Sequence, residues 1–288
     1  MTKKILEKIY MRTNIIKATA IALVITACGG SKKEATTATP AESKVVLSDQ
    51  LMMSTLWMQK SHEAKYLQRQ AYELAALKLD ANMKKGRSKK PLAIILDLDE
   101  TVLDNSPYEA RLVLTGKNFT PESWNTWVME AQAEPVAGAR EFLEKANRLG
   151  LEIFYISNRA ENHLEATVRN LQRLELPFAD EGHVLLKNED SSSKTERRER
   201  IKQTHKVVLL VGDQMGDFSE EPFIEEEAIR EGFVSPLMDS ASAYFVLLPN
   251  PLYGSFESGI YGGQRGLSDE VKNQYRRKAL DPKQDMVR

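Results

Sequence analysis

Two aspartates stand one residue apart immediately after a short apolar run. The run is Leu92 to Leu96, and Asp97 and Asp99 follow it in the segment PLAIILDLDETVLDNSP. Such runs, rich in β-branched residues, are typical of strands buried on both faces of a parallel sheet. Residues two apart on an extended segment point to the same side, so we expect both carboxylates to face one pocket. Their charges repel unless a cation lies between them or one stays protonated, and Mg²⁺ meets that demand.

Other polar residues suit the same pocket. Some follow two later apolar runs, at 153–156 and 207–211, and one lies between these runs. In open α/β sheets, ligands bind at the carboxyl ends of the strands, so these residues are expected at one edge of the sheet. An acidic turn after a strand is the simpler explanation of Asp97 and Asp99 alone. The wider set favours a functional site instead: Ser157, Asn158, Lys194, Asp213 and Asp217.

The four features, DxDxT, a strand-end SN, a lysine and GDxxxD, resemble the motifs of the haloacid dehalogenase (HAD) superfamily, whose phosphatases use an aspartate nucleophile. The resemblance implies that Asp97 forms an aspartyl-phosphate with a phosphomonoester. Asp99 is then the general acid for the leaving alcohol and afterwards the base for water. An acid must be protonated near the working pH, and the neighbouring carboxylate is expected to raise the pKa of Asp99.

The expected metal ligands are Asp97, the backbone carbonyl of Asp99, and Asp213. Asp217 is expected either to bind the metal directly or to accept a hydrogen bond just outside the metal's ligands. The phosphoryl oxygens need donors, and the candidates are the Ser157 hydroxyl, the Asn158 backbone amide and the Lys194 ammonium. Lys194 lies in a basic segment, 187–206, that alternatively forms a solvated face, and Lys187 is the rival candidate.

Strand-like and helix-like segments alternate, which predicts an α/β fold: a HAD-like, Rossmannoid three-layer sandwich with a central parallel sheet. A helical segment precedes it from Ser48, a plausible N-cap, to Met83, with a break near Ser61. Strands are expected at 92–96, 153–156, 183–186, 207–211 and 244–248, and helices at 135–150, 163–174, 194–203 and 224–231.

A small cap insertion is expected at about 107–135, directly after the proposed catalytic strand. Pro121, after Thr120, predicts the start of a short helix that carries Trp124 and Trp127. This insertion is well placed to form a lid over the pocket. From the spacing alone, its aromatic residues either stack on a planar ligand such as a nucleobase or pack the insertion against the domain.

Composition gives no reason to expect a nucleic-acid duplex as partner. Lys plus Arg number 40 and Asp plus Glu 41, and the chain contains no common nucleic-acid module. The four histidines show no metal-ligand spacing. With one cysteine, Cys28, the chain cannot form an intrachain disulfide.

The N-terminal segment resembles a bacterial lipoprotein signal. A basic start and the apolar stretch 18–27, too short to span a bilayer, lead to ITAC and Cys28. We expect residues 1–28 to be the signal, with translation starting at Met11, and Cys28 to carry fatty acids such as palmitate. We expect residues 29–45 to form a flexible tether and residues 46–288 to form the phosphatase domain.

Longer strings narrow the resemblance to the class C bacterial acid phosphatases of the outer-membrane lipoprotein "e" type: WMQKSHEAKYLQRQAYELA, DLDETVLDNSPYEA, SNR, GDQMGDF and PNPLYGSFE. This implies an Mg²⁺-dependent hydrolase acting on nucleoside monophosphates, including nicotinamide mononucleotide, as a 5′-nucleotidase at the outer membrane, facing the periplasm or the cell surface. Trp124 and Tyr253 then match the base-stacking aromatics, and Tyr275 a further one. Phe256, where tryptophan is common, and the loop 214–216 depart from the family pattern, which leaves the substrate preference open.

Two other functions remain open from the sequence. One is a phosphotransferase or sugar-phosphate phosphatase that uses the same aspartate. The other is a surface lipoprotein that mainly binds haem or a nucleotide, although a pure binder has no need of Asp97 and Asp99 together. The sequence also leaves open whether the protein is a monomer or a homodimer.

Overall fold

A computed structural model describes residues 45–84, 88–188, 193–219 and 242–280. The predicted signal, Cys28, nearly all of the tether and the predicted helix at 224–231 lie outside these residues. No helix in the described part is both long and apolar enough to cross a membrane.

Five parallel strands form the central sheet, in the order β5-β4-β1-β6-β7. Their bounds are β1 (Leu92–Leu96), β4 (Glu152–Ala160), β5 (Val184–Lys187), β6 (Lys206–Gly212) and β7 (Phe245–Leu247). In the register, Ile95 of β1 lies opposite Phe154 of β4 and Leu210 of β6. The predicted parallel sheet is confirmed, and β1 is its central strand.

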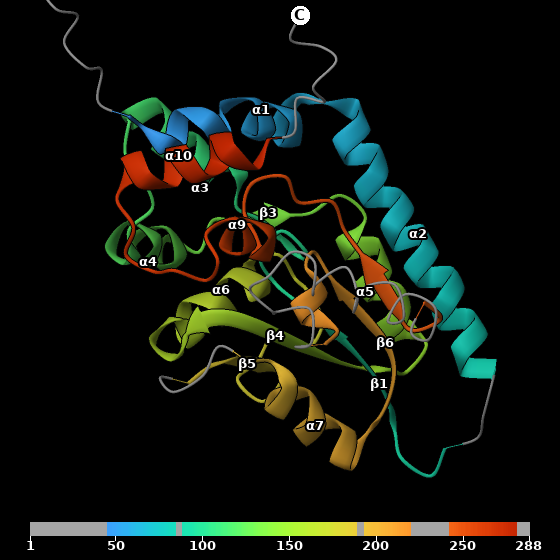
Figure 1. Cartoon of the computed structure of the whole chain (residues 1–288). Coiled ribbons are helices and arrows are strands. Elements are labelled where there is room, and N and C mark those ends of the chain that lie inside the picture. The colour runs from blue at the N-terminus through green and yellow to red at the C-terminus, as the bar shows by residue number, and fades with distance from the viewer. Residues whose placement is uncertain (1–44, 85–87, 189–192, 220–241, 281–288) are drawn as a thin grey trace, which may run out of the picture. The chain divides into compact units, whose positions relative to one another are not determined.

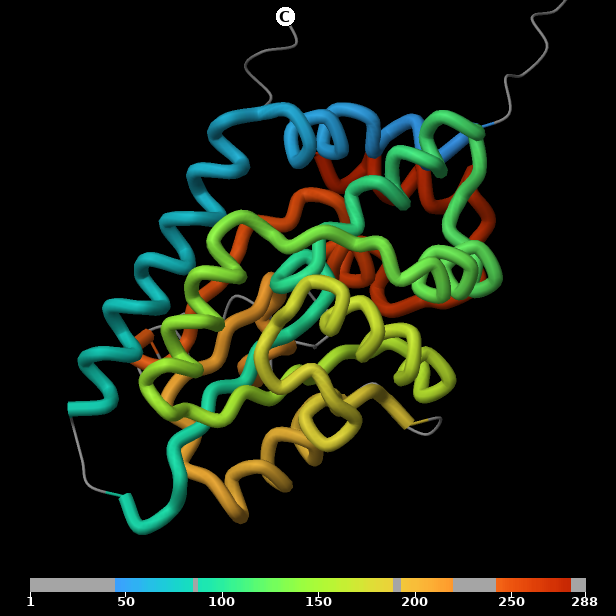
Figure 2. The backbone as a smooth tube through the Cα atoms, turned by 180° about the vertical axis from the view of Figure 1, so that it is seen from behind, coloured from blue at the N-terminus to red at the C-terminus, as the bar shows by residue number. Residues whose placement is uncertain are grey.

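Helices cover both faces of this sheet (Figures 1 and 2). Alternate residues of β1 enter two separate hydrophobic clusters, Ile94 and Leu96 on one face and Ala93 and Ile95 on the other. The first face is covered by α2 (His62–Lys84), α5 (Ala139–Arg148) and α6 (Leu164–Arg173), and the second by α7 (Thr195–Thr204). This is the predicted three-layer arrangement.

The helical N-terminal segment divides as predicted but begins differently. Ser61 separates α1 (Met52–Lys60) from α2, and its hydroxyl accepts a hydrogen bond from the Ala64 amide as an N-cap. The prediction of Ser48 as an N-cap is wrong, because Ser48 lies inside the 3₁₀ helix η1 (Leu47–Leu51) and its amide donates to Asn118. That contact joins segments 70 residues apart, which local sequence does not reveal.

The segment after β1 holds more helix than its sequence pattern indicates. It contains α3 (Ser106–Thr115), which was not predicted, and α4 (Pro121–Glu130), which begins at Pro121 as expected and is capped by Thr120. A two-stranded sheet closes it, formed by β2 (Leu103–Asp104) and β3 (Glu134–Pro135). Because Pro135 pairs with Leu103 in that sheet, α5 begins only at Ala139 rather than at Pro135.

The C-terminal part adds the helices α9 (Ser255–Ile260) and α10 (Asp269–Ala279). Hydrogen bonds join α10 to the N-terminal segment: Gln50 contacts Asn273 and Arg276. Figure 1 shows α10 beside α1 and α3, above the end of the sheet where the loops after β1 and β6 lie. These helices therefore stand at the edge of the sheet where the sequence predicts the site.

Candidate active site

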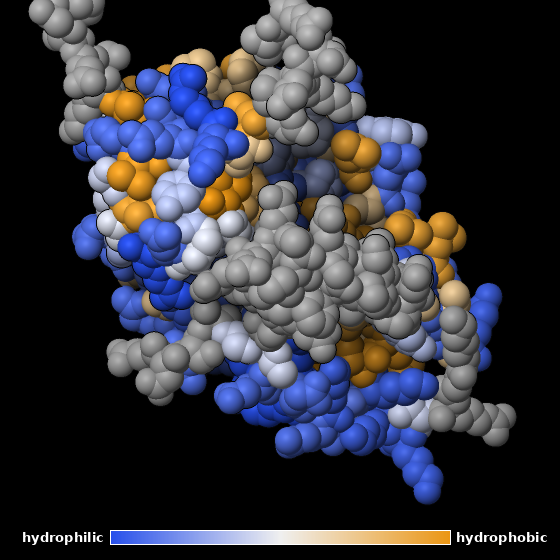
Figure 3. All heavy atoms as spheres, viewed as in Figure 1, coloured by the Kyte–Doolittle hydropathy of each residue, from blue (hydrophilic) through white to orange (hydrophobic). Residues whose placement is uncertain are grey.

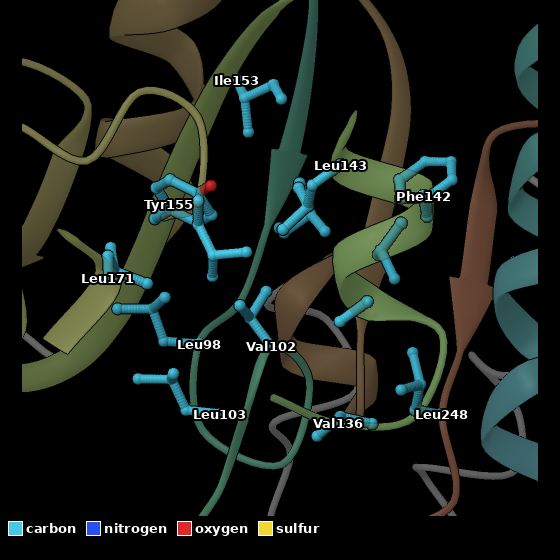
Figure 4. Close-up of a cluster of buried hydrophobic side chains, with 14 of the residues drawn as sticks. Leu98, Val102, Leu103, Val136, Phe142, Leu143, Ile153, Tyr155, Leu171 and Leu248 are labelled. Carbon is cyan, nitrogen blue, oxygen red and sulfur yellow. The ribbon is translucent and has the colours of Figure 1, made fainter. Parts of the chain in front are cut away.

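The loop after β1 is anchored so that its aspartates stay at the edge of the sheet. The Leu98 side chain, between them in sequence, is fully buried in the core with Val102 and Leu103 (Figure 4). Its carbonyl accepts hydrogen bonds from the amides of Val102 and Leu103, both at 2.8 Å. The Asp97 amide donates to Val211 of β6 at 2.9 Å. The buried leucine thus fixes where the aspartates on either side of it lie.

Three aspartates come together at the ends of β1 and β6. Oxygens of Asp97, Asp213 and Asp217 lie within 4.8 Å of one another. Burial, followed by repulsion from Asp217, raises the pKa of Asp213 to about 7, and burial likewise raises the pKa of Asp97 well above its usual range. Oxygen donors of this kind, too crowded to be ionised together unaided, fit a hard divalent cation.

Gly212 lets Asp217 approach the end of β6. A Cβ at this position would overlap the Cβ, Cγ and Oδ2 of Asp217. Oδ2 of Asp217 accepts a hydrogen bond from the Gln214 amide at 2.9 Å, which fixes the carboxylate. The glycine is therefore needed for close packing rather than for an unusual backbone angle.

Lys194 is buried beside two of these aspartates and does not belong to a solvated face. Its ammonium donates to Asp97 and, at 2.6 Å, to Oδ1 of Asp217. Lys194 precedes α7, which is largely exposed and charged, and hydrophilic side chains cover the lower edge of the view in Figure 3, where α7 lies in Figure 1. Lys194 lines the cavity described below, and the rival Lys187 is not among the described lining residues.

Asp99 is held by an arginine, and the expected rise of its pKa is wrong for this structure. Burial alone would raise the pKa, but the Arg159 guanidinium outweighs it and holds the pKa of Asp99 below its ordinary value. Arg159 Nη2 lies 2.8 Å from Oδ1, and Ser157 and Asn105 add hydrogen bonds at 2.9 Å each. Repulsion from the neighbouring carboxylate alone would raise this pKa, but the arginine of the SNR motif reverses the direction.

Ser157 and Asn158 lie on β4 beside this ion pair. Ser157 is fully buried, and its hydroxyl donates to Asp99. Asn158 lines the cavity, while its side-chain oxygen accepts a hydrogen bond from Arg197 at 2.7 Å. With the Asn158 side chain held in this way, its backbone amide remains the candidate donor to a phosphate.

A cavity of about 520 Å³ opens beside the aspartates. Asp97, Asp99, Lys194 and Asp213 line it at one part, and aromatic and apolar side chains line the remainder, including Phe119, Trp124 and Tyr253. The structure therefore brings both predicted stacking residues to the site. Tyr275 is not among the described lining residues and instead contacts Tyr261, with ring centroids 6.0 Å apart; Phe256 is exposed on α9.

A buried acid missed by the sequence reasoning links the two sides of the site. Glu100 is fully buried and has a left-handed backbone (φ 59°). Its carboxylate accepts hydrogen bonds from the Asn105 amide at 2.9 Å and from the Tyr253 hydroxyl. Trp127 donates to Asn105 at 2.8 Å and so packs the insertion rather than lining the cavity. The DLDET string contains Glu100, but its spacing gave no sign of a partner 153 residues away.

Comparison with known proteins agrees with this geometry. A family model described as HAD superfamily, subfamily IIIB (acid phosphatase) matches residues 16–256. The chain is similar to the class C acid phosphatase from Bacillus anthracis, solved with and without tungstate: 40% identity, TM-score 0.78, covering 82% of this chain and 99% of that one.

Plant proteins are more distant relatives. Acid phosphatase 1 from Solanum lycopersicum is 27% identical over 55% of this chain, which spans only 57% of the tomato protein. Vegetative storage protein 1 from Arabidopsis thaliana is 28% identical over 74% of this chain and 71% of that protein. Because the family model covers most of the chain and the Bacillus structure shares its fold, the chain belongs to subfamily IIIB of the HAD superfamily, the acid phosphatase family.

Proposed function

We propose that this member of the acid phosphatase family is an Mg²⁺-dependent phosphomonoesterase that hydrolyses nucleoside monophosphates, including nicotinamide mononucleotide. One observation carries the proposal. A buried cluster of Asp97, Lys194, Asp213 and Asp217 meets a cavity of about 520 Å³ whose other walls hold Trp124 and Tyr253. The cluster suits a phosphoryl group, and the aromatic walls suit a planar leaving group.

Asp97 is the proposed nucleophile because it stands where β1 ends and lines the cavity. A carboxylate oxygen of Asp97 bonds to phosphorus as the bond between phosphorus and the ester oxygen breaks. Asp99 gives its proton to the departing alcohol. In the second half, Asp99 takes a proton from water as the water oxygen bonds to phosphorus, and the bond to Asp97 breaks to release phosphate.

Asp99 must acquire its proton before the first step, because Arg159 favours its ionised form. A phosphate dianion bound beside Asp99 raises its pKa by repulsion, and acidic solution acts in the same direction. A cation held by Asp97, Asp213 and Asp217 would neutralise charge on the phosphoryl oxygens.

The phosphoryl oxygens are proposed to bind Lys194 and the Asn158 amide. The Ser157 hydroxyl, which donates to Asp99 in this structure, can join them only when it releases that acid. Lys194 is buried and therefore acts in a medium where its charge is weakly screened. The Bacillus relative was solved with tungstate, a tetrahedral oxyanion like phosphate, which supports an oxyanion site in this family.

The decisive experiment measures phosphate release by residues 45–288 from a panel of nucleotides and sugar phosphates, with Mg²⁺ and then with a chelator. We expect hydrolysis that the chelator abolishes and added Mg²⁺ restores, with nucleotides preferred. Chelator-resistant turnover would contradict the metal dependence. Equal or greater rates with sugar phosphates would instead favour the sugar-phosphate phosphatase.

A binding role is the alternative from a different class, and it is notable that some relatives are named as storage proteins. The buried cluster argues against it here. Crowded buried acids are costly to a fold, and a protein that only retains a ligand has no need of them, whereas such clusters are typical of catalytic sites. Stoichiometric retention of a nucleotide without release of phosphate would favour that alternative.

We also infer that the chain is a cell-envelope lipoprotein attached through Cys28, on the basis of the ITAC segment and its apolar leader. Metabolic labelling with a palmitate analogue tests this inference. The full chain should be labelled and sediment with outer membranes, whereas Cys28→Ser should lose the label. Labelling that survives in Cys28→Ser would contradict it.

A further inference from the structure

Glu109 on α3 is a buried carboxylate that lines the cavity without a role in the proposed chemistry. Glu109 lines the cavity together with Tyr108 and Leu112 of the same helix, and it is 6% exposed. Within the described part of the chain, its carboxylate has no hydrogen-bond or ion-pair partner. Buried acids are normally paired, so an unpaired one facing a cavity is ready to receive a ligand.

The charged groups around Glu109 do not neutralise it. The nearby Glu257 of α9 repels it, and burial together with that repulsion raises the pKa of Glu109 to about 7. Arg276 of α10, a cation that lines the same cavity, is engaged by Glu257, Tyr261 and Gln50. Asp269 and Lys272 of α10 also line the cavity and carry opposite charges. Glu109 and Glu257 therefore leave the cavity with an excess of acceptor groups.

Aromatic side chains line the same cavity as Glu109. The rings of Tyr108 and Trp124 meet edge to face with centroids 5.1 Å apart, so the residue next to Glu109 in sequence supports the predicted stacking residue. Tyr253 lies two residues before α9, which begins at Ser255 and carries Glu257. Because both acids also line this cavity, a ring held by these aromatics shares the cavity with Glu109 and Glu257.

We propose that Glu109 determines specificity by accepting a hydrogen bond from an amino group on the leaving group, so that amino-bearing nucleobases are preferred. Above pH 7, where Glu109 is ionised, its carboxylate only accepts hydrogen bonds, so it selects for N–H donors and against groups that lack them. This inference rests on the proposed function and adds the class of leaving group.

The test compares two substrates that differ only in that donor: AMP and purine riboside 5′-monophosphate, which lacks the amino group. The measured quantity is the ratio of their kcat/KM values at pH 8, where Glu109 is ionised, in wild type, in Glu109→Gln and in Glu122→Gln. Glu122 lies exposed on α4 and controls for loss of one negative charge. Because the ratio is taken within one preparation, it does not depend on how much of a variant folds.

We expect wild type and Glu122→Gln to prefer AMP by about 10-fold, the usual scale of a hydrogen bond to a charged group. In Glu109→Gln the ratio should fall toward one, because an amide both donates and accepts. An equal ratio in wild type and Glu109→Gln overturns the inference alone, provided that both substrates are hydrolysed. If wild type hydrolyses neither these nucleotides nor p-nitrophenyl phosphate, the proposed function fails and this inference fails with it.

Discussion

The ammonium group of Lys194 lies 2.6 Å from Oδ1 of Asp217 and also hydrogen-bonds Asp97, so one buried cation holds the proposed nucleophile and an acid from the 3₁₀ turn after β6. The two acids are separated by 120 residues in sequence, and the lysine comes from the start of α7. The positive charge of Lys194 offsets part of the repulsion between these carboxylates, which explains why the folded protein tolerates them so close together.

Replacement of Lys194 should therefore impair both the chemistry and the order of the site. We expect Lys194→Gln to lower kcat by about 10²- to 10³-fold, the scale for loss of one preorganised donor to a developing charge. Lys202→Gln, on the exposed side of α7, is the matched control and should retain wild-type rates. Steady-state kinetics with p-nitrophenyl phosphate decides the matter, and wild-type kcat in Lys194→Gln would show that the lysine is dispensable.

Gly212 should tolerate no side chain, because a Cβ there overlaps Asp217. We expect Gly212→Ala to displace Asp217 and to raise the Mg²⁺ concentration that gives half-maximal activity by about 10-fold or more, a loss typical when the surroundings of a metal site are disturbed. Gly182→Ala is the control, since its added Cβ meets only Oδ1 of Asp180, at 3.2 Å, in an exposed loop. An unchanged Mg²⁺ titration in Gly212→Ala would mean that the position of Asp217 does not matter to the metal.

Trp124 should contribute to nucleotide binding and little to the chemical step. Aromatic stacking on a base contributes about 1–3 kcal/mol, so Trp124→Leu should lower kcat/KM for AMP by about 10-fold. The kcat/KM for glycerol 3-phosphate, which has no ring, should change much less. The control variant, Trp57→Leu on α1, should change kcat/KM for neither substrate. An equal loss with both substrates would indicate that Trp124 serves packing, the alternative that the spacing left open.

The stability of the protein should depend on pH through Glu109. The pKa of this acid is about 7 in the folded protein and near its ordinary value of 4.5 in the unfolded chain. Below pH 4.5 both states are protonated and stability is unaffected. Between pH 4.5 and 7 only the unfolded state ionises, so the free energy of unfolding falls, and above pH 7 the loss is complete.

Glu109→Gln removes this loss and should be more stable than wild type at pH 8, by up to about 3 kcal/mol from the size of the shift. The difference should vanish below pH 4.5. Chemical denaturation of both proteins at pH 4.5, 6 and 8 measures it. A difference that is constant across these pH values would show that the ionisation of Glu109 is not its cause.

The parts of the fold that were predicted correctly depend on strong local signals. The apolar run 92–96 identified the central strand, Thr120 and Pro121 identified the start of α4, and Ser61 marked the break between two helices. Each signal lies within a few residues of the feature that it specifies. The sheet edge then brought the predicted acids together, because parallel strands end on the same side.

The parts that were missed depend on contacts between distant segments. Arg159 meets Asp99 across 60 residues, and Tyr253 meets Glu100 across 153. Such pairs determine the pKa values of the site acids and the positions of their side chains, but no periodic pattern in the sequence indicates which distant residues meet. Glu109 was missed for the same reason, since only the folded cavity shows that its carboxylate has no partner among the described residues.

The central claim is that the carboxylate of Asp97 carries the phosphoryl group during turnover. The most direct measurement is mass spectrometry of peptides from enzyme quenched in acid during hydrolysis of an excess of p-nitrophenyl phosphate with Mg²⁺. We predict a phosphoryl group on the peptide that contains Asp97, sensitive to hydroxylamine, and neither phosphorylation nor turnover in Asp97→Asn. Undiminished phosphate release by Asp97→Asn, or a phosphoryl group found on another residue, would contradict the account.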